Sequence, residues 1–156
     1  MFSILIPTFN NLNYLNLCFK SLTNNSLLEH EIIIHVNGGF DGTLDFVKEN
    51  NLKYTYTSEN VGLCTAINTA SKVSTNKYIV YAHDDMYFCP KWDSYLMDEI
   101  NCIGHDNFYL SATMIEPNSG HIKFDCGKNI ETFNEDKLLS NYKNLKFYDH
   151  QGTHFA

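Results

Sequence analysis

Arginine is absent from the sequence, so its eleven basic residues are all lysines. Eighteen aspartates and glutamates outnumber them, and the formal net charge at pH 7 is -7. A groove that binds a nucleic-acid backbone needs a concentration of basic side chains, because it must neutralise phosphate groups. The composition argues against nucleic acid as a partner.

Long apolar runs are missing as well. No stretch of the 156 residues approaches the roughly 20 apolar residues that a membrane-spanning helix needs. Met1 leads directly into strand-like sequence, without the basic flank and cleavage site of a secretory signal peptide. The sequence predicts no transmembrane segment and a cytoplasmic location.

The cysteines follow neither a disulfide pattern nor a zinc-binding pattern. Their number is odd, and no pair has the C-x-x-C spacing of structural zinc sites. Free thiols are expected at Cys18, Cys64, Cys89, Cys102 and Cys126.

Short apolar runs alternate with amphipathic segments along most of the chain. The runs predict strands at residues 2–6, 31–36, 53–58, 78–82 and 108–115. Apolar residues at helical spacing predict helices between these strands, and such connections imply right-handed crossovers and parallel pairing. The predicted fold class is therefore α/β, with a mostly parallel central sheet, helices on both faces, and one domain over residues 1–156.

Several local features refine this prediction. Pro7 should end the first strand, because proline cannot donate to a strand ladder. Asp41 can cap a short helix after the second strand. A turn at residues 116–120 leads into residues 121–124, which could pair as a hairpin, and residues 135–142 have the pattern of a polar surface helix.

Ligands of open α/β sheets bind at the carboxyl ends of the strands, so the segments that follow the strands are the candidate site. Those segments are residues 7–10, 37–41, 59–62 and 83–85. None contains the glycine pattern of a dinucleotide-binding turn or of a P-loop, which argues against both kinds of phosphate site.

The most informative pair is Asp84 and Asp85, which follow the apolar run at residues 78–82. Two adjacent carboxylates repel each other, and a hard cation such as Mg²⁺ or Mn²⁺ is the usual compensation. In the alternative interpretation, one aspartate caps the next turn and the other is solvated. His83 is either a further metal ligand or a hydrogen-bonded structural residue.

Four segments resemble a known family in order and spacing. They read SILIPTFNNLNYLNLCFKSL, EIIIHVNGGFDGT, NVGLCTAINTA and YIVYAHDDMYFCPKW, and MIEPNSGHIKF resembles the segment that follows. This set is similar to the nucleotide-diphospho-sugar glycosyltransferases of the GT-A fold, in particular the inverting family two. The resemblance implies a Rossmann-like fold, with a donor half at residues 1–115 and the start of an incomplete acceptor half at residues 116–156.

The resemblance also implies a site for a UDP-, GDP- or dTDP-sugar and transfer of the sugar to an acceptor hydroxyl, as on a saccharide. Asp85 would coordinate Mn²⁺ or Mg²⁺ on the diphosphate, Asp84 would contact the ribose or the metal, and His83 is a further candidate ligand. Thr8 and Phe9 would border the base or ribose. The full set of implied donor-binding residues is Pro7, Thr8, Phe9, Asn37, Gly62 and Asp84.

Two departures from the family pattern stand out. Val36 occupies the place of an aspartate, so base recognition would fall to Asn37 or to backbone groups. The segment that carries the family's catalytic base does not follow, and Glu135, Asp136 and Asp149 stand in a different context. The catalytic base is therefore unassigned.

Other functions remain open from the sequence. A nucleotide-sugar-binding module without turnover would agree with the missing catalytic segment. A nucleotidyltransferase also uses paired aspartates and a divalent metal, but the PTFNN segment lacks its glycine-rich loop with a lysine or arginine. A purely structural α/β domain is the remaining alternative.

Overall fold

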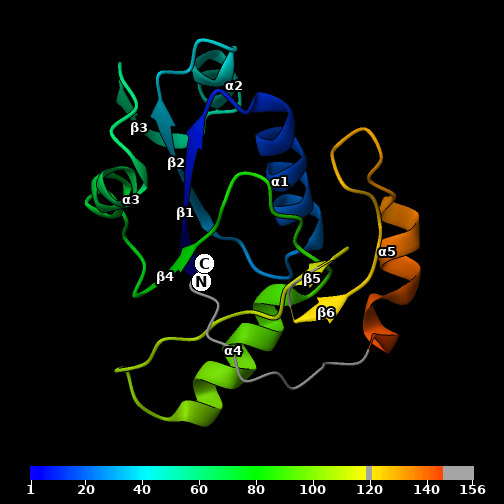
Figure 1. Cartoon of the computed structure of the whole chain (residues 1–156). Helices are drawn as coiled ribbons and strands as arrows, with labels where there is room; N and C mark the ends of the chain where they lie inside the picture. Colours follow the sequence, from blue (N-terminus) through cyan, green and yellow to red (C-terminus); the bar gives the residue numbers. More distant parts are fainter. Residues whose placement is uncertain (119–120, 146–156) are drawn as a thin grey trace. The chain divides into compact units, whose positions relative to one another are not determined.

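The computed structural model describes residues 1–118 and 121–145 (Figure 1). The chain divides into two compact units, Met1–Ser94 and Tyr95–Ala156. A single domain over residues 1–156, with halves that meet at residue 115, stays a prediction. Within the described residues, none of the helices combines the length and apolar character needed to cross a bilayer.

The first unit is built on four parallel strands in the order β3-β2-β1-β4. These strands are β1 (Phe2–Phe9), β2 (Glu31–Asn37), β3 (Lys53–Thr57) and β4 (Tyr78–Tyr81). The central strand β1 is buried from Phe2 to Thr8, which explains its nearly continuous apolar sequence. The predicted α/β class with a mostly parallel sheet is confirmed.

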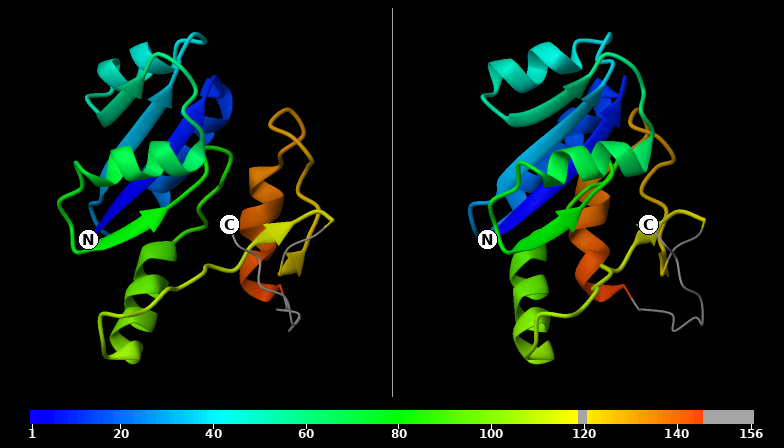
Figure 2. Two further views of the ribbon diagram at one scale, coloured as in Figure 1. Left: turned by 60° about the vertical axis from the view of Figure 1, so that its left-hand side comes forward. Right: turned by 90° about the vertical axis from the view of Figure 1, so that its left-hand side faces the viewer.

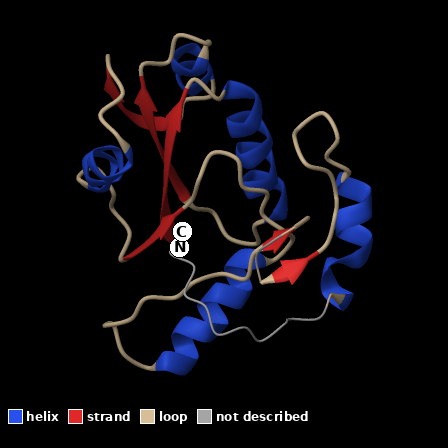
Figure 3. Cartoon of the chain, in the orientation of Figure 1, coloured by secondary structure: helices blue, strands red, loops and turns tan. Residues whose placement is uncertain are grey.

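Helices cover both faces of this sheet (Figures 1 and 3). Helices α1 (Leu12–Asn25) and α2 (Thr43–Glu49) lie on one face, and α3 (Leu63–Ser71) crosses the other, as Figure 2 shows. Under α3, Leu5 and Ile33 form a buried cluster with Ala70. The alternation of side chains along β1 and β2 thus supplies an apolar layer to each face.

Pro7 does not end the first strand, which corrects the prediction from the sequence. It lies within β1 and is paired in register with His35. The Leu5 carbonyl accepts from the Ala82 N–H, so odd-numbered residues of β1 direct their backbone groups toward β4. Because β4 ends at Tyr81, the position of Pro7 has no strand partner there, and its missing N–H leaves no ladder bond unmade.

The second unit differs from the predictions made for it. Residues 108–114 form no regular element, and of the strand predicted at residues 108–115 only Ile115 lies in a strand, β5 (Ile115–Glu116). It pairs in parallel with β6 (Ile122–Lys123), so the predicted hairpin, which would be antiparallel, is wrong. An apolar run becomes a strand only where another strand bonds to its backbone groups, and here the carbonyls of Met114 and Glu116 accept from the N–H groups of Ile122 and Phe124.

The remaining helices are α4 (Trp92–Ile103), α5 (Glu135–Asn141) and a short 3-10 turn (Tyr142–Asn144). The polar helix predicted at residues 135–142 is thereby confirmed to within one residue. The side chain of Asn134 accepts from the N–H of Lys137 and so caps the start of α5. None of the five cysteines forms a disulfide bond, as expected.

Two histidine side chains, those of His30 and His35, are buried in the first unit. His30 accepts the Phe2 N–H at Nδ1 and therefore carries its proton on Nε2, 3.1 Å from Asp93 Oδ2. His35 contacts Thr55 Oγ1 at 2.7 Å through Nδ1. Burial lowers the pKa of both imidazoles, against the opposing effects of Asp93 on His30 and of Asn37 on His35.

We expect the protein to lose stability as the pH falls below about 6.5, the ordinary pKa of histidine. The folded-state pKa of His30 and of His35 is lowered, so below that pH the unfolded chain binds more protons than the folded one. Each histidine can contribute a slope of up to about 1.4 kcal/mol per pH unit. Urea unfolding followed by circular dichroism at pH 7.5, 6.5 and 5.5 measures this slope.

The variant His35→Gln should reduce the slope, whatever its effect on stability at neutral pH. His105→Gln, which changes an exposed histidine, is the matched control and should preserve the slope. A free energy of unfolding that stays constant between pH 7.5 and 5.5 would contradict the role given to the two buried imidazoles.

Candidate functional site

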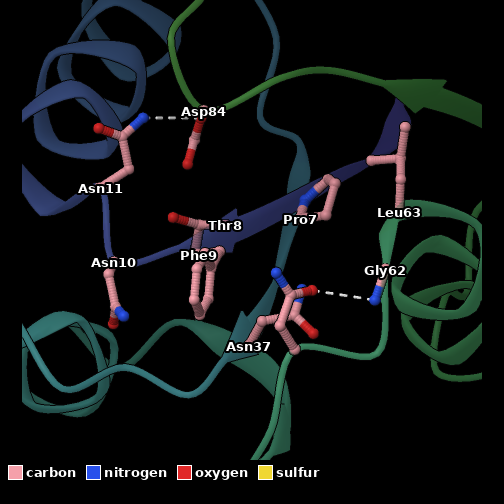
Figure 4. A pocket seen from close by; sticks show the side chains of 10 residues that line it. Pro7, Thr8, Phe9, Asn10, Asn11, Asn37, Gly62, Leu63 and Asp84 are labelled. Carbon is pink, nitrogen blue, oxygen red and sulfur yellow. Dashed lines mark hydrogen bonds between the residues drawn. The ribbon is translucent and has the colours of Figure 1, made fainter.

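A cavity of about 370 Å³ lies at the carboxyl ends of β1 and β2, beside the start of α3 (Figure 4). This is the edge of the sheet at which the sequence places the candidate site. The lining residues are Pro7, Thr8, Phe9, Asn10, Asn11, Asn37, Asn60, Gly62, Leu63 and Asp84.

All six residues predicted to bind a donor line this cavity, although their role as ligands stays a prediction. Four further lining residues were not predicted: Asn10, Asn11, Asn60 and Leu63. Asn10 and Asn60 belong to segments that follow strands, so their position was a usable signal. Asn11 gave no comparable signal, because its place in the cavity depends on the turn after β1.

Asp84 is held in place at the cavity wall. Asn11 Nδ2 donates to Asp84 Oδ1 at 3.0 Å, as the dashed line in Figure 4 shows. Burial raises the pKa of Asp84, the nearby Thr8 hydroxyl and Asn11 oppose that rise, and the charge of Asp85 adds to it. The negative charge of this carboxylate is therefore costly in the absence of a cation.

Thr8 carries a polar atom without a partner. Its Oγ1 is buried and makes no hydrogen bond of good geometry within the described residues, although the side chain points toward Asp84 (Figure 4). Buried hydroxyl groups in folded proteins are nearly always hydrogen-bonded, because an unmade bond leaves the cost of desolvation unrecovered. A ligand with a polar group in the cavity would complete this bond.

Hydrogen bonds connect the loops that surround the cavity. Asn10 Oδ1 accepts from the Phe40 N–H at 2.9 Å, and Asp41 Oδ2 accepts from the Leu12 N–H at 2.8 Å. Asp41 Oδ1 also accepts from the backbone N–H and the hydroxyl of Thr43, the first residue of α2. The N-cap residue of α2 is Gly42, so the capping role predicted for Asp41 is wrong. The turn after β1 is thus joined to the turn after β2.

Asn37 joins the second of these turns to the loop before α3. Its Oδ1 accepts from the Val61 N–H at 3.1 Å and from Thr57 Oγ1 at 3.2 Å. The Gly62 N–H donates to Asn60 Oδ1 at 2.9 Å. Three loops from separate parts of the chain therefore present a preorganised wall to a ligand.

The family model for glycosyl transferase family 2 matches residues 3–155. The chain belongs to glycosyl transferase family 2. The family predicted from the four sequence segments is therefore confirmed.

The curated relatives are much longer proteins. Chondroitin synthase of Pasteurella multocida (strain Pm70) and hyaluronan synthase of Pasteurella multocida are each 32% identical to this chain over 92 residues. The match covers 56% of this chain and 10% of each relative. The chain thus spans a small part of the length of the relatives that it matches.

Solved structures support the fold. The S. aureus TarS structure has a TM-score of 0.58 at 22% identity and covers 64% of this chain, which covers 19% of that one. The structure of TarS 1-349 in complex with UDP has a TM-score of 0.56 at 23% identity, with 66% and 32% covered. The GT-A-like α/β fold of this family 2 chain agrees with both.

Of the three residues predicted to hold a metal, Asp84 lines the cavity, and His83 and Asp85 are its neighbours in the sequence. Asp85 is exposed, and His83 Nε2 lies 2.7 Å from the Tyr81 hydroxyl. Neither residue lines the cavity, and among the described residues no group of three or more His, Cys, Asp or Glu side chains could hold an ion. Two carboxylates do suffice for Mg²⁺ or Mn²⁺ where phosphate oxygens and water supply the other ligands.

Proposed function

We propose that this chain binds a nucleoside-diphosphate sugar and forms the donor site of a glycosyltransferase that transfers the sugar to an acceptor hydroxyl. Family membership supports the transfer of sugars. The observation that carries the proposal is the cavity at the carboxyl ends of the strands, with the unpartnered Thr8 hydroxyl in its wall. A cytoplasmic location also stays a prediction.

The lining of the cavity suits the nucleoside rather than the diphosphate. Four asparagine carboxamides and the Thr8 hydroxyl offer donors and acceptors to the oxygen and nitrogen atoms of a ribose or base. Within the described part of the chain, no lysine lines the cavity. A diphosphate placed beside Asp84 would therefore meet repulsion unless a cation lay between them.

Mn²⁺ or Mg²⁺ is the group that would remove this repulsion. Bound to Asp85, with Asp84 as a second carboxylate, it would neutralise the diphosphate and stabilise it as a leaving group. Asn11 orients the Asp84 carboxylate, and burial makes that carboxylate a group whose charge gains from a nearby cation. The exposed position of Asp85 leaves room for phosphate oxygens and water.

The catalytic base stays unassigned. Asp84 is the only carboxylate in the cavity wall among the described residues, and it is engaged by Asn11. Glu135 and Asp136 belong to α5 in the second unit, and Asp149 lies outside the described residues. This observation favours, as a second candidate, a donor-binding module that another polypeptide segment must complete for turnover.

Calorimetric titration tests the proposal directly. UDP, GDP and dTDP are titrated into the full chain, each with Mn²⁺ and with EDTA in its place. UDP is the first choice because the related TarS 1-349 structure contains it. We expect at least one nucleotide to bind, with an affinity at least about tenfold higher when Mn²⁺ is present.

The absence of binding by all three nucleotides would refute the donor site. Nucleotide binding that is equally tight in EDTA would refute the proposed role of the metal and would still support the donor site. Release of nucleoside diphosphate from UDP-, GDP- or dTDP-sugars, with and without saccharide acceptors, separates a transferase from a binding module.

A further inference from the structure

The segment that joins β4 to α4 contains no helix or strand, although it carries Asp84 and Asp85. It covers residues 82–91 and runs beside α1 (Figure 1). The backbone groups of such a segment lack the partners that a helix or a sheet supplies, so other parts of the fold must bond to them. Here those partners come from α1.

Four side chains form a polar stripe along α1, which we call the α1 stripe. They are Asn11 at the N-cap position, Cys18, Ser21 and Asn25. Positions 11, 18 and 25 are seven residues apart, and position 21 lies between the last two, so all four project from one face of the helix. Ser21 is buried, at a place where helices normally carry apolar side chains.

Ser21 and Asn25 hold the second half of the segment. Ser21 Oγ accepts from the Phe88 N–H at 3.0 Å, and Asn25 Nδ2 donates to the Phe88 carbonyl at 2.7 Å. The Asn25 carbonyl also accepts from the Lys91 N–H at 2.8 Å. Both backbone groups of Phe88 are therefore bonded to side chains of α1.

The other two members of the stripe hold the aspartate turn, residues 83–86. Asn11 Nδ2 donates to Asp84 Oδ1 at 3.0 Å, and Cys18 Sγ donates to the His83 carbonyl at 3.6 Å. The same carbonyl closes the turn by accepting from the N–H three residues further along, at 3.4 Å. The turn is thus attached to α1 at its backbone as well as at one carboxylate.

Tyr81, the last residue of β4, holds the first residue of the aspartate turn. Its hydroxyl lies 2.7 Å from His83 Nε2, and the centres of the two rings are 4.9 Å apart. Asp85 is exposed, so its place depends on the backbone of the turn rather than on packing of its own side chain. Any shift of this backbone would move the carboxylate of Asp85.

We propose that the α1 stripe positions the aspartate turn for a divalent cation, and that Ser21 and Asn25 are positioning residues of this metal site. This inference rests on the proposed function. Neither residue lines the cavity, so their effect reaches the carboxylates through the backbone. Groups that orient the ligands of a metal typically change its affinity by about 10- to 100-fold, and a turn that is held in advance lowers the entropic cost of binding.

Asn25→Asp tests the proposal with little change of shape, because a carboxylate cannot donate to the Phe88 carbonyl. UDP, GDP and dTDP are titrated into the full chain at a series of Mn²⁺ concentrations and in EDTA. We expect the Mn²⁺ concentration that gives half of the gain in affinity to rise by about tenfold, and the affinity in EDTA to stay unchanged. Asn24→Asp adds the same charge at an exposed neighbour on α1 and should behave as the wild type.

Ser21→Ala removes the acceptor of the Phe88 N–H without adding a charge. It should also raise the half-maximal Mn²⁺ concentration, and it decides the question if Asn25→Asp does not unfold cooperatively in urea. Thr23→Val is its control, because the exposed Thr23 hydroxyl donates to carbonyls of α1 itself. This control should keep the wild-type dependence on Mn²⁺.

An unchanged dependence on Mn²⁺ in folded Ser21→Ala protein, even at lower stability, would overturn the positioning role, and the donor site would stand. Equal losses of nucleotide affinity with Mn²⁺ and with EDTA would overturn it too, because they would reflect a general disturbance of the cavity. A wild-type chain that binds nucleotide equally well in EDTA would overturn this inference together with the metal. A wild-type chain that binds no nucleotide would overturn the proposed function itself.

Discussion

Replacing Asp85 with alanine is expected to remove most of the increase in nucleotide affinity that Mn²⁺ produces. We expect an increase of at least about tenfold in the wild-type chain, whereas in the variant the affinities measured with Mn²⁺ and with EDTA should approach each other. Asp85 is exposed and lies beside the costly charge of Asp84, so the cation loses its more accessible ligand. Calorimetric titration of the nucleotide under both conditions measures the ratio.

The fold should be unaffected by this change, because little packing is lost at an exposed position. Glu49→Ala removes a carboxylate from the last residue of α2 and serves as the control for net charge. It should preserve the full effect of Mn²⁺. A wild-type response to Mn²⁺ in the Asp85→Ala protein would mean that the cation is bound elsewhere.

Replacing Asp93 with alanine should produce a large decrease in the free energy of unfolding. The carboxylate is fully buried, and its Oδ2 accepts from the N–H groups of Leu27 and Leu28, at 2.8 Å each, and from His30. Truncation leaves the partly buried N–H groups of Leu27 and Leu28 and the His30 Nε2–H without this acceptor, and a buried donor left unsatisfied costs about 1–3 kcal/mol. Urea unfolding at pH 7.5, followed by circular dichroism, measures the change.

Asp93→Asn retains an acceptor oxygen and should lose less stability than Asp93→Ala. Asp98→Ala changes an exposed aspartate on the same helix, α4, and is expected to stay within about 0.5 kcal/mol of the wild type. If the free energy of unfolding of Asp93→Ala falls by less than about 1 kcal/mol, water or a rearranged backbone must supply a new acceptor to the N–H groups that Asp93 had bonded.

The two central strands of the first unit, β1 and β2, could be predicted because burial on both faces leaves a direct record in sequence. Apolar residues run consecutively at residues 4–7 of β1 and 32–34 of β2, whereas those of a half-exposed strand would alternate with polar ones. The same reasoning failed at residues 108–114, where an apolar run exists without a partner strand in the described chain. A hydrophobic pattern indicates that a segment is buried, but strand pairing also requires a second strand, which can lie far away in the sequence.

Pro7 shows the same limitation at one residue. Its cost in a strand depends on whether a neighbouring carbonyl faces it, and that depends on where β4 ends. No property of the local sequence contains this information.

The sequence by itself determined the α/β class, the family and the edge of the sheet at which the cavity lies. The class and the edge follow from local pattern and from the rule that parallel strands present their carboxyl ends together, and the family follows from the resemblance of four segments. Only the tertiary structure decided that Asn11 holds Asp84, that the Thr8 hydroxyl is left unpartnered, and that the rings of Phe9 and Phe40 both lie close to Gly38. Hydrogen bonds and ring contacts depend on distances between residues remote in the chain, and those distances exist only once the strands have paired.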